Sequence, residues 1–215
     1  LALGAAVLHA GWNLVAKRAE GDLYMVLWAQ FFVGAIYALP LMVAYQVVWG
    51  IPWQGYAWAA VSGVVHLPYL WLLAKAYTHG DFSVSYPVAR GGGAALAATC
   101  GVLFLGDHLS ALEVAGIAVV VGGLCVLAYG ATGRDLALAL AVAGTIGLYT
   151  TADAKGARIT DSVGYVFASG VATVVTNTAF ALITGRRREM GAMLRSNWRR
   201  SSVTGLAALV TYGMV

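Results

Sequence analysis

The stretch "LYMVLWAQFFVGAIYALPLMVAYQVV", residues 23–48, contains no Asp, Glu, Lys or Arg. A helix needs about 20 apolar residues to cross the hydrocarbon core of a bilayer. A strand of an outer-membrane barrel would instead alternate polar and apolar residues over about ten positions. The length and uniformity of this stretch therefore predict a membrane-spanning α-helix.

The same pattern recurs along the chain. Of the 215 residues, 60% are hydrophobic and only 10% are charged, whereas soluble domains carry about 25% charged residues. The connectors between apolar runs are short and leave no room for a soluble domain. The sequence thus predicts an all-α, polytopic transmembrane helix bundle. Its eight expected helices, the last of them truncated, cover residues 1–16, 23–48, 56–77, 82–105, 109–129, 136–154, 163–184 and 203–215.

Positive charges predict how the helices are oriented. The connectors after the first, third, fifth and seventh helices carry ten Lys and Arg residues, and the other connectors carry two. Six of the ten are arginines in residues 185–200, which we interpret as a connector. By the positive-inside rule, the odd-numbered connectors are cytoplasmic. Because the basic residues lie at helix ends, the net charge of +4 does not indicate a nucleic-acid partner.

Two distant stretches share an order of features. In "LHAGWNLVAKRAEGDLYMVLW" (8–28) and "LYTTADAKGARITDSVGYVF" (148–167), a ring residue is followed four positions later by an amide or an acid. A basic helix end, an acidic residue and an aromatic-rich span then follow. This pattern predicts two five-helix repeats, 1–132 and 133–215, of which the second contains three helices. An odd number of helices per repeat would invert the second repeat in the membrane.

Several stretches resemble the EamA-like branch of the drug/metabolite transporter superfamily. They are "LHAGWNLVAKR" (8–18), "GDFSVSYPVARGGGAALAA" (80–98) followed by "LFLGDHLS" (103–110), and "GLYTTADAKGAR" (147–158). The resemblance implies a ten-helix carrier in the cytoplasmic (inner) membrane, of which eight helices are present. Asp107 stands where such proteins more often have Glu. The family usually places both termini in the cytoplasm, whereas the charges place residue 1 outside.

The resemblance implies a secondary-active transporter, an exporter or an uptake carrier, that moves a small polar or amphipathic metabolite by alternating access. A receptor or structural membrane protein and an intramembrane lipid-modifying enzyme are the alternatives. We do not expect an enzyme, because no phosphate-binding G-x-x-x-x-G-K-[ST] loop is present and the histidines lack metal-ligand spacing. No cofactor and no metal are expected. The substrate, the coupling ion and the oligomeric state stay open.

Arg90 is the first candidate for substrate binding. A charge in hydrocarbon costs roughly 2.5–3.5 kcal/mol on insertion scales, so its presence inside an apolar run needs an explanation. Tyr86 lies one turn before it on the same helical face, and Gly91–Gly93 follow it. Arg90 could bind an anionic group of the substrate, with the glycines leaving room for that group. Alternatively, it anchors the bundle through a carboxylate or carbonyl partner, or extends its charge to the nearby membrane interface.

Further polar and aromatic residues could complete a binding site. His9, Trp12 and Asn13 lie close together in the first expected helix, and His66 and Tyr69 share one face of the third. Their rings could stack on a substrate. The alternative is that each forms hydrogen bonds between helices, as polar residues of membrane bundles often do.

Asp153 is the candidate for proton coupling. It is the carboxylate that lies deepest in an expected span, and Tyr149 lies one turn before it. Intramembrane carboxylates often belong to proton relays. Asp153 could also neutralise Arg90, or lie at the membrane interface because Lys155 is close.

Overall fold

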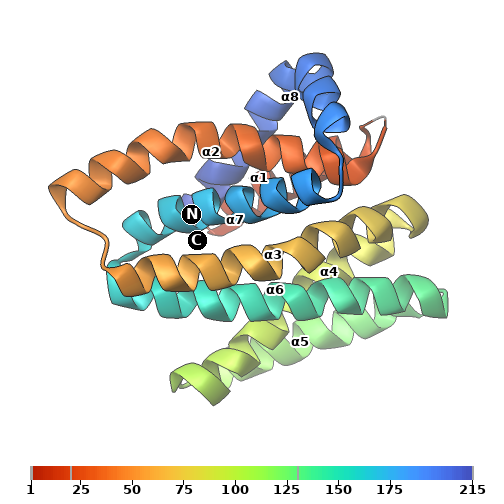
Figure 1. The fold of residues 1–215 in the computed structure, drawn as a ribbon. Helices are drawn as coiled ribbons and strands as arrows, with labels where there is room; N and C mark the ends of the chain where they lie inside the picture. Colours follow the sequence, from red (N-terminus) through yellow and green to blue (C-terminus); the bar gives the residue numbers. More distant parts are fainter. Residues whose placement is uncertain (1, 20, 130, 215) are drawn as a thin grey trace. The chain divides into compact units, whose positions relative to one another are not determined.

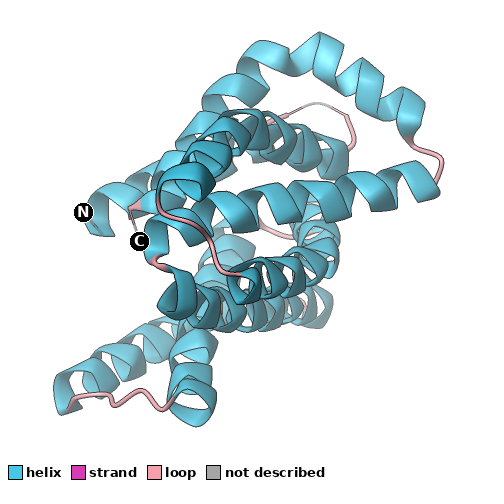
Figure 2. Ribbon diagram, turned by 60° about the vertical axis from the view of Figure 1, so that its left-hand side comes forward, coloured by secondary structure: helices cyan, strands magenta, loops and turns pink. Residues whose placement is uncertain are grey.

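The computed structural model describes residues 2–19, 21–129 and 131–214. Within these ranges the chain is helical, without a strand, and short loops join the helices (Figure 2). The predicted all-α class is thereby confirmed. The predicted ends of the bundle at residues 1 and 215 lie outside the described residues. The elements are α1 (Ala2–Lys17), α2 (Leu23–Val48), α3 (Trp53–His79), α4 (Phe82–Cys100), the π-helical turn η1 (Gly101–Leu105), α5 (Ala111–Ala128), α6 (Gly133–Thr160), α7 (Ser162–Ile183) and α8 (Arg187–Gly213).

Six helices of the described chain are long and apolar enough to cross a membrane. They are α2, α3, α4 together with η1, α5, α6 and α7. The exposure of α5 also indicates a membrane environment. None of its residues is buried, although its mean hydropathy is 2.3. Apolar surface of this extent is unfavourable in water. The helices therefore indicate a multi-pass membrane protein that is embedded in a lipid bilayer.

Short polar side chains begin several of the helices. Asp22, Asp81 and Asp161 each precede a helix and accept hydrogen bonds from backbone amides of its first turn. Ser110 and Glu113 form a reciprocal capping box at the start of α5. Such caps satisfy amides that have no partner inside the helix. The acidic residues in the connectors thus define where the apolar helices begin.

The interpretation of residues 185–200 as a connector is wrong. Helix α8 begins at Arg187 and runs through most of this segment. Met190, Met193 and Leu194 follow the three-and-four spacing of a helix and are less exposed than Arg187, Arg188 and Arg195, so the segment forms an amphipathic helix. The backbone leaves the helical region at Asn197 (φ −123°, ψ 17°), where α8 has a break.

The stretch 82–105 also differs from the single regular helix that was expected. The α-helical part ends at Cys100, and the chain continues as the π-helical turn η1 to Leu105. Gly106 then adopts a left-handed conformation (φ 73°) that ends the helix, as glycine commonly does at helix ends. The span keeps its predicted bounds but changes its hydrogen-bonding pattern near one end.

The chain forms two compact units, and each is described by itself. Unit 1 consists of residues 1–67 and 153–215, and unit 2 consists of residues 68–152. Helices α3 and α6 contribute to both. These units differ from the expected repeats 1–132 and 133–215. A repeat is defined by internal similarity and not by compactness, so the inverted repeat remains a prediction.

Helix α2 packs against α7 and α8 in unit 1 (Figure 1). Glycines allow the backbones of α2 and α8 to touch. A Cβ atom on Gly205 would lie 2.5 Å from the carbonyl oxygen of Gln30 and 2.8 Å from the amide nitrogen of Gly34. Small residues permit such close approach between membrane helices.

Candidate functional site

Arg90 lies among aromatic rings in unit 2. Its Nη2 atom donates a hydrogen bond of 2.8 Å to the hydroxyl oxygen of Tyr69 on α3. The Cζ atom lies 5.7 Å from the ring centre of Tyr69 and 6.0 Å from that of Tyr86. Tyr77 and Tyr149 are further electrostatic neighbours of the guanidinium. Tyrosines from α3, α4 and α6 therefore surround the charge.

The contact with Tyr69 does not neutralise Arg90, because a phenol at neutral pH carries no negative charge. It satisfies one N–H group of the guanidinium and fixes the direction in which the side chain points. The nearby rings can add cation–π attraction. This arrangement supports both roles considered for Arg90: the phenol is an internal partner, and the retained charge could attract an anion.

The glycines after Arg90 lie against neighbouring side chains of unit 2. A Cβ atom on Gly91 would lie 2.9 Å from a side-chain carbon of Leu124, and one on Gly93 would lie 2.5 Å from a side-chain carbon of Ile146. The expectation that these glycines leave room for a substrate group therefore does not describe Gly91 or Gly93. Both permit α4 to pack closely against its neighbours, α5 and α6.

Tyr149 belongs to the Arg90 cluster. Its ring centre lies 5.2 Å from that of Tyr69, in an edge-on arrangement with an interplanar angle of 66°. Unit 2 thus brings together four residues that were selected from the sequence: Tyr69, Tyr86, Arg90 and Tyr149.

A second group of candidate residues gathers in unit 1. The ring of Trp12 lies edge-on to that of His9, with 4.8 Å between ring centres. Phe31 on α2 connects this pair to α3, because its ring lies 6.4 Å from Trp12 and 6.5 Å from His66. The fully buried Asn13 donates a 2.7 Å hydrogen bond to the carbonyl oxygen of His9. This contact within α1 is the kind that the structural alternative expects.

Asp153 lies in the interior of unit 1, since only 8% of its surface is exposed. Tyr165 on α7 donates a 2.9 Å hydrogen bond to its Oδ1 atom, and Tyr212 on α8 donates one to Oδ2. One carboxylate therefore joins α6, α7 and α8.

The Asp153 cluster extends toward α3. Ser62 on α3 is a polar neighbour of the Tyr165 hydroxyl, and the Oγ atom of Ser62 lies 3.4 Å from Nδ1 of His66. The same nitrogen lies 2.8 Å from the carbonyl oxygen of Ser62. Polar groups thus form a continuous series from Asp153 to His66 within unit 1.

Five residues of these clusters were not identified from the sequence. Phe31 lies in α2, whose apolar residues surround the helix and mark no preferred face, and Ser62 is one small residue among many in α3. The aromatic-rich run after Asp161 gave a weak signal for Tyr165. No signal in the sequence singled out the remaining two residues, Tyr77 and Tyr212.

The comparisons with known proteins add no family to this description. Neither a family model, nor a curated protein, nor a solved structure gives a significant match to the chain.

Proposed function

We propose that the chain is part of a secondary-active transporter that moves a small polar or amphipathic metabolite across the cytoplasmic membrane by alternating access. The resemblance of its motifs to the EamA-like branch motivates this function. The observation that carries it is the tyrosine-lined Arg90 in an otherwise apolar span. Ionisable residues inside membrane spans usually belong to functional sites, because they are costly to retain.

In this proposal, Arg90 binds an anionic group of the substrate. Its guanidinium has five N–H donors in a planar arrangement that matches a carboxylate or a phosphate. Tyr69 is one hydrogen-bond partner of the guanidinium, Tyr77 is another polar neighbour, and the rings of Tyr69 and Tyr86 supply apolar surface beside the charge. A substrate with both an anionic group and an apolar or aromatic part would use these features together.

Asp153 is the proposed coupling residue. A buried carboxylate can exchange a proton when the protein changes conformation, because its surroundings then change. The phenols of Tyr165 and Tyr212 contact both of its oxygens, so a movement of α7 or α8 would alter these hydrogen bonds. Within unit 1, described by itself, His9, Trp12, Asn13 and His66 remain the proposed substrate-binding residues.

A ligand-stability screen followed by a transport assay tests the proposal. The purified protein is heated with amino acids, sugars, nucleotides and amphipathic cations, because a ligand that binds the native state raises the apparent Tm. Ligands that raise it are then offered to proteoliposomes with and without a proton gradient. We expect at least one anionic compound to stabilise the protein and to accumulate against its gradient. Stabilising ligands that never cross the membrane would favour a receptor over a transporter.

A further inference from the structure

Unit 1 contains a second polar feature, which the transport proposal does not use. A cavity of about 860 Å³ lies where the α1–α2 connector and the start of α2 face the first part of α8. Three arginines and two carboxylates are among its lining residues: Arg18, Arg186, Arg200, Asp22 and Glu189. The cavity therefore carries an excess of positive charge.

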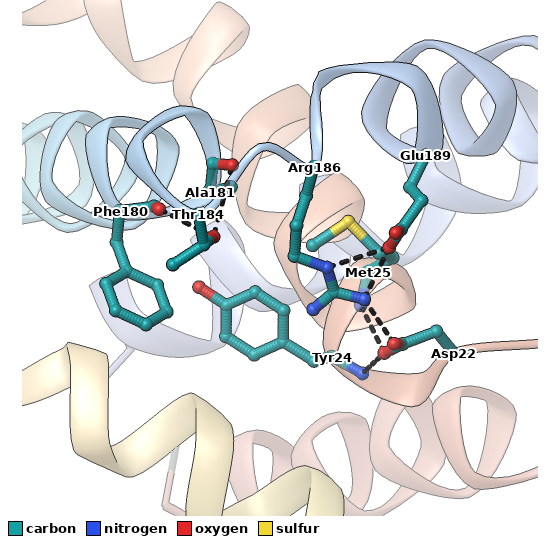
Figure 3. Close-up of polar contacts among 8 residues, drawn as sticks. All are labelled: Asp22, Tyr24, Met25, Phe180, Ala181, Thr184, Arg186 and Glu189. Atoms are coloured by element: carbon teal, nitrogen blue, oxygen red, sulfur yellow. Dashed lines mark hydrogen bonds and ion pairs between the residues drawn. The ribbon is translucent and has the colours of Figure 1, made fainter.

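Both carboxylates of the cavity are bound to the same arginine (Figure 3). Arg186 donates through Nε to Glu189, at 2.7 Å, and through Nη2 to Asp22. Its Cζ atom lies 5.3 Å from the ring centre of Tyr24. Burial lowers the pKa of Arg186, but hydrogen bonds to Glu189 and Asp22 and their negative charges outweigh burial and raise that pKa above its usual value. Arg186 stays charged and already has two anionic partners.

Arg18 and Arg200 are the other two arginines that line the cavity. Arg200 donates through Nη2 to the carbonyl oxygen of Val15 at the end of α1. A carbonyl oxygen carries no full negative charge, so this bond positions the guanidinium without neutralising it. Arg18 lies exposed one residue after α1 ends. These two arginines give the cavity the character of an anion-binding site.

The break in α8 lies beside the cavity. The side chains of Ser196 and Asn197, at the point where the backbone leaves the helical region, line the cavity. Immediately after the break, Trp198 is exposed and lies 5.6 Å below the Cζ atom of Arg199. Tryptophan and arginine are favoured at the level of lipid headgroups.

The first part of α8 has the composition of a helix that lies at a membrane surface. Met190, Met193 and Leu194 form its apolar side, whereas Arg187, Arg188 and Arg195 are exposed. Amphipathic helices with basic polar faces bind the headgroup region of anionic membranes. Met25 and Met193 also line the cavity, so the cavity offers apolar contact beside its arginines.

We propose that this arginine-lined cavity binds the phosphate of an anionic phospholipid, with Arg18 and Arg200 as its charged contacts. The exposed Trp198 and the amphipathic start of α8 place the cavity at the depth of lipid headgroups, which favours a lipid over a phosphate from solution. The site shares no residue with the Arg90 or the Asp153 cluster, and its existence does not depend on the transport function.

The test uses delipidated protein in detergent, to which phosphatidylglycerol, phosphatidylcholine or inorganic phosphate is added. The apparent Tm and the number of retained lipids by native mass spectrometry are measured. We expect phosphatidylglycerol to raise the Tm and to be retained. Phosphatidylcholine and millimolar inorganic phosphate should have little effect. If inorganic phosphate raises the Tm as much as phosphatidylglycerol does, the assignment to a lipid is overturned.

Matched variants distinguish the cavity from general surface charge. The double variant Arg18→Gln/Arg200→Gln removes two positive charges inside the cavity, and Arg187→Gln/Arg188→Gln removes two from exposed positions of α8 that do not line it. Because charge-assisted contacts would be lost, we expect the first pair to weaken phosphatidylglycerol binding by about tenfold or more and the second by about twofold or less. Equal losses in the two variants would refute the cavity site.

A conservative double substitution tests whether misfolding explains a loss of lipid binding. Arg18→Lys/Arg200→Lys keeps both charges but loses the planar donor arrangement. We expect it to retain an intermediate affinity for phosphatidylglycerol. If the Gln pair does not fold, a weaker affinity for phosphatidylglycerol in this folded Lys pair supports the arginine contacts, and unchanged affinity contradicts them.

Discussion

Tyr165 on α7 donates a hydrogen bond of 2.9 Å to the Oδ1 atom of Asp153 on α6. Tyr212 on α8 donates to the other carboxylate oxygen. Residues separated by 12 and 59 positions in the chain thus meet at one buried charge. Buried charges are stable in proteins only when polar partners compensate for lost hydration, so these two phenols explain how Asp153 can lie in the interior.

Removing either phenol hydroxyl should destabilise unit 1. We expect Tyr165→Phe and Tyr212→Phe each to lower the free energy of unfolding by about 1–3 kcal/mol, because a buried charged acceptor loses one donor. Their effects should not add, since the two residues share one carboxylate. Tyr129→Phe is the matched control, because Tyr129 is 93% exposed. If the control and the two variants have equal Tm values, the hydrogen bonds to Asp153 do not stabilise the protein.

The coupling role of Asp153 can be separated from its structural role. Asp153→Asn keeps the size of the side chain but cannot take up a proton, so we expect transport to continue without responding to the proton gradient. The measurement is uptake of a stabilising ligand into proteoliposomes with and without a pH difference. Tyr212→Phe is a useful comparison, because it weakens the same cluster and keeps the carboxylate. If uptake by Asp153→Asn depends on the pH difference as uptake by the wild type does, Asp153 has a structural role and does not couple transport to protons.

The crossing of α2 and α8 depends on Gly205. We expect Gly205→Ala to lower the Tm, because its Cβ atom would lie 2.5 Å from a backbone oxygen, which cannot move as a flexible side chain can. The cost should be several kcal/mol, at the upper end of the effects of overpacking. Gly122→Ala is the control, since a Cβ atom there meets no atom within 4 Å. If both variants melt alike, the close approach of the two helices is not important for stability.

The orientation of the chain is accessible to labelling. In a background with Cys100 and Cys125 replaced by Ala, one new cysteine is placed at Arg195 and, in a second protein, at Pro52. An impermeant thiol reagent applied to intact cells should label Pro52→Cys and not Arg195→Cys, because the arginine-rich segment is expected to be cytoplasmic. The reverse pattern would favour the orientation that the family resemblance implies.

The sequence predicted the helical spans well where composition alone determines them. Helix α2 has the predicted bounds 23–48, because Asp22 caps its first turn and Trp49 caps its end. The error at residues 185–200 has a different cause. Six arginines suggested a connector, but the helical spacing of Met190, Met193 and Leu194 outweighs charge once one side of the segment packs against the rest of unit 1.

The sequence predicted members of the clusters better than their partners. Arg90 and Asp153 stood out because a charge in an apolar run is costly. Of their tyrosine partners, Tyr69 was selected because it shares a helix face with His66. Tyr165 and Tyr212 were not selected, since they resemble many aromatic residues of membrane helices. Contacts between helices depend on how each helix is rotated about its axis, and uniformly apolar helices such as α2 and α5 contain little information on that rotation.

Arg90 requires two measurements on the same preparation, because its contact with Tyr69 suits either of its roles. If Arg90 binds the substrate, Arg90→Ala should nearly abolish ligand affinity, Arg90→Lys should weaken it, and the Tm without ligand should change little. Tyr69→Phe tests the contact itself, since it removes one hydrogen-bond acceptor of Arg90 and keeps the charge and the ring. If Arg90 instead anchors the helices, its loss leaves buried polar groups without their partner. The Tm without ligand would then fall strongly in Arg90→Ala, while the folded fraction would bind the ligand as the wild type does, and the proposed substrate site would have to be sought elsewhere.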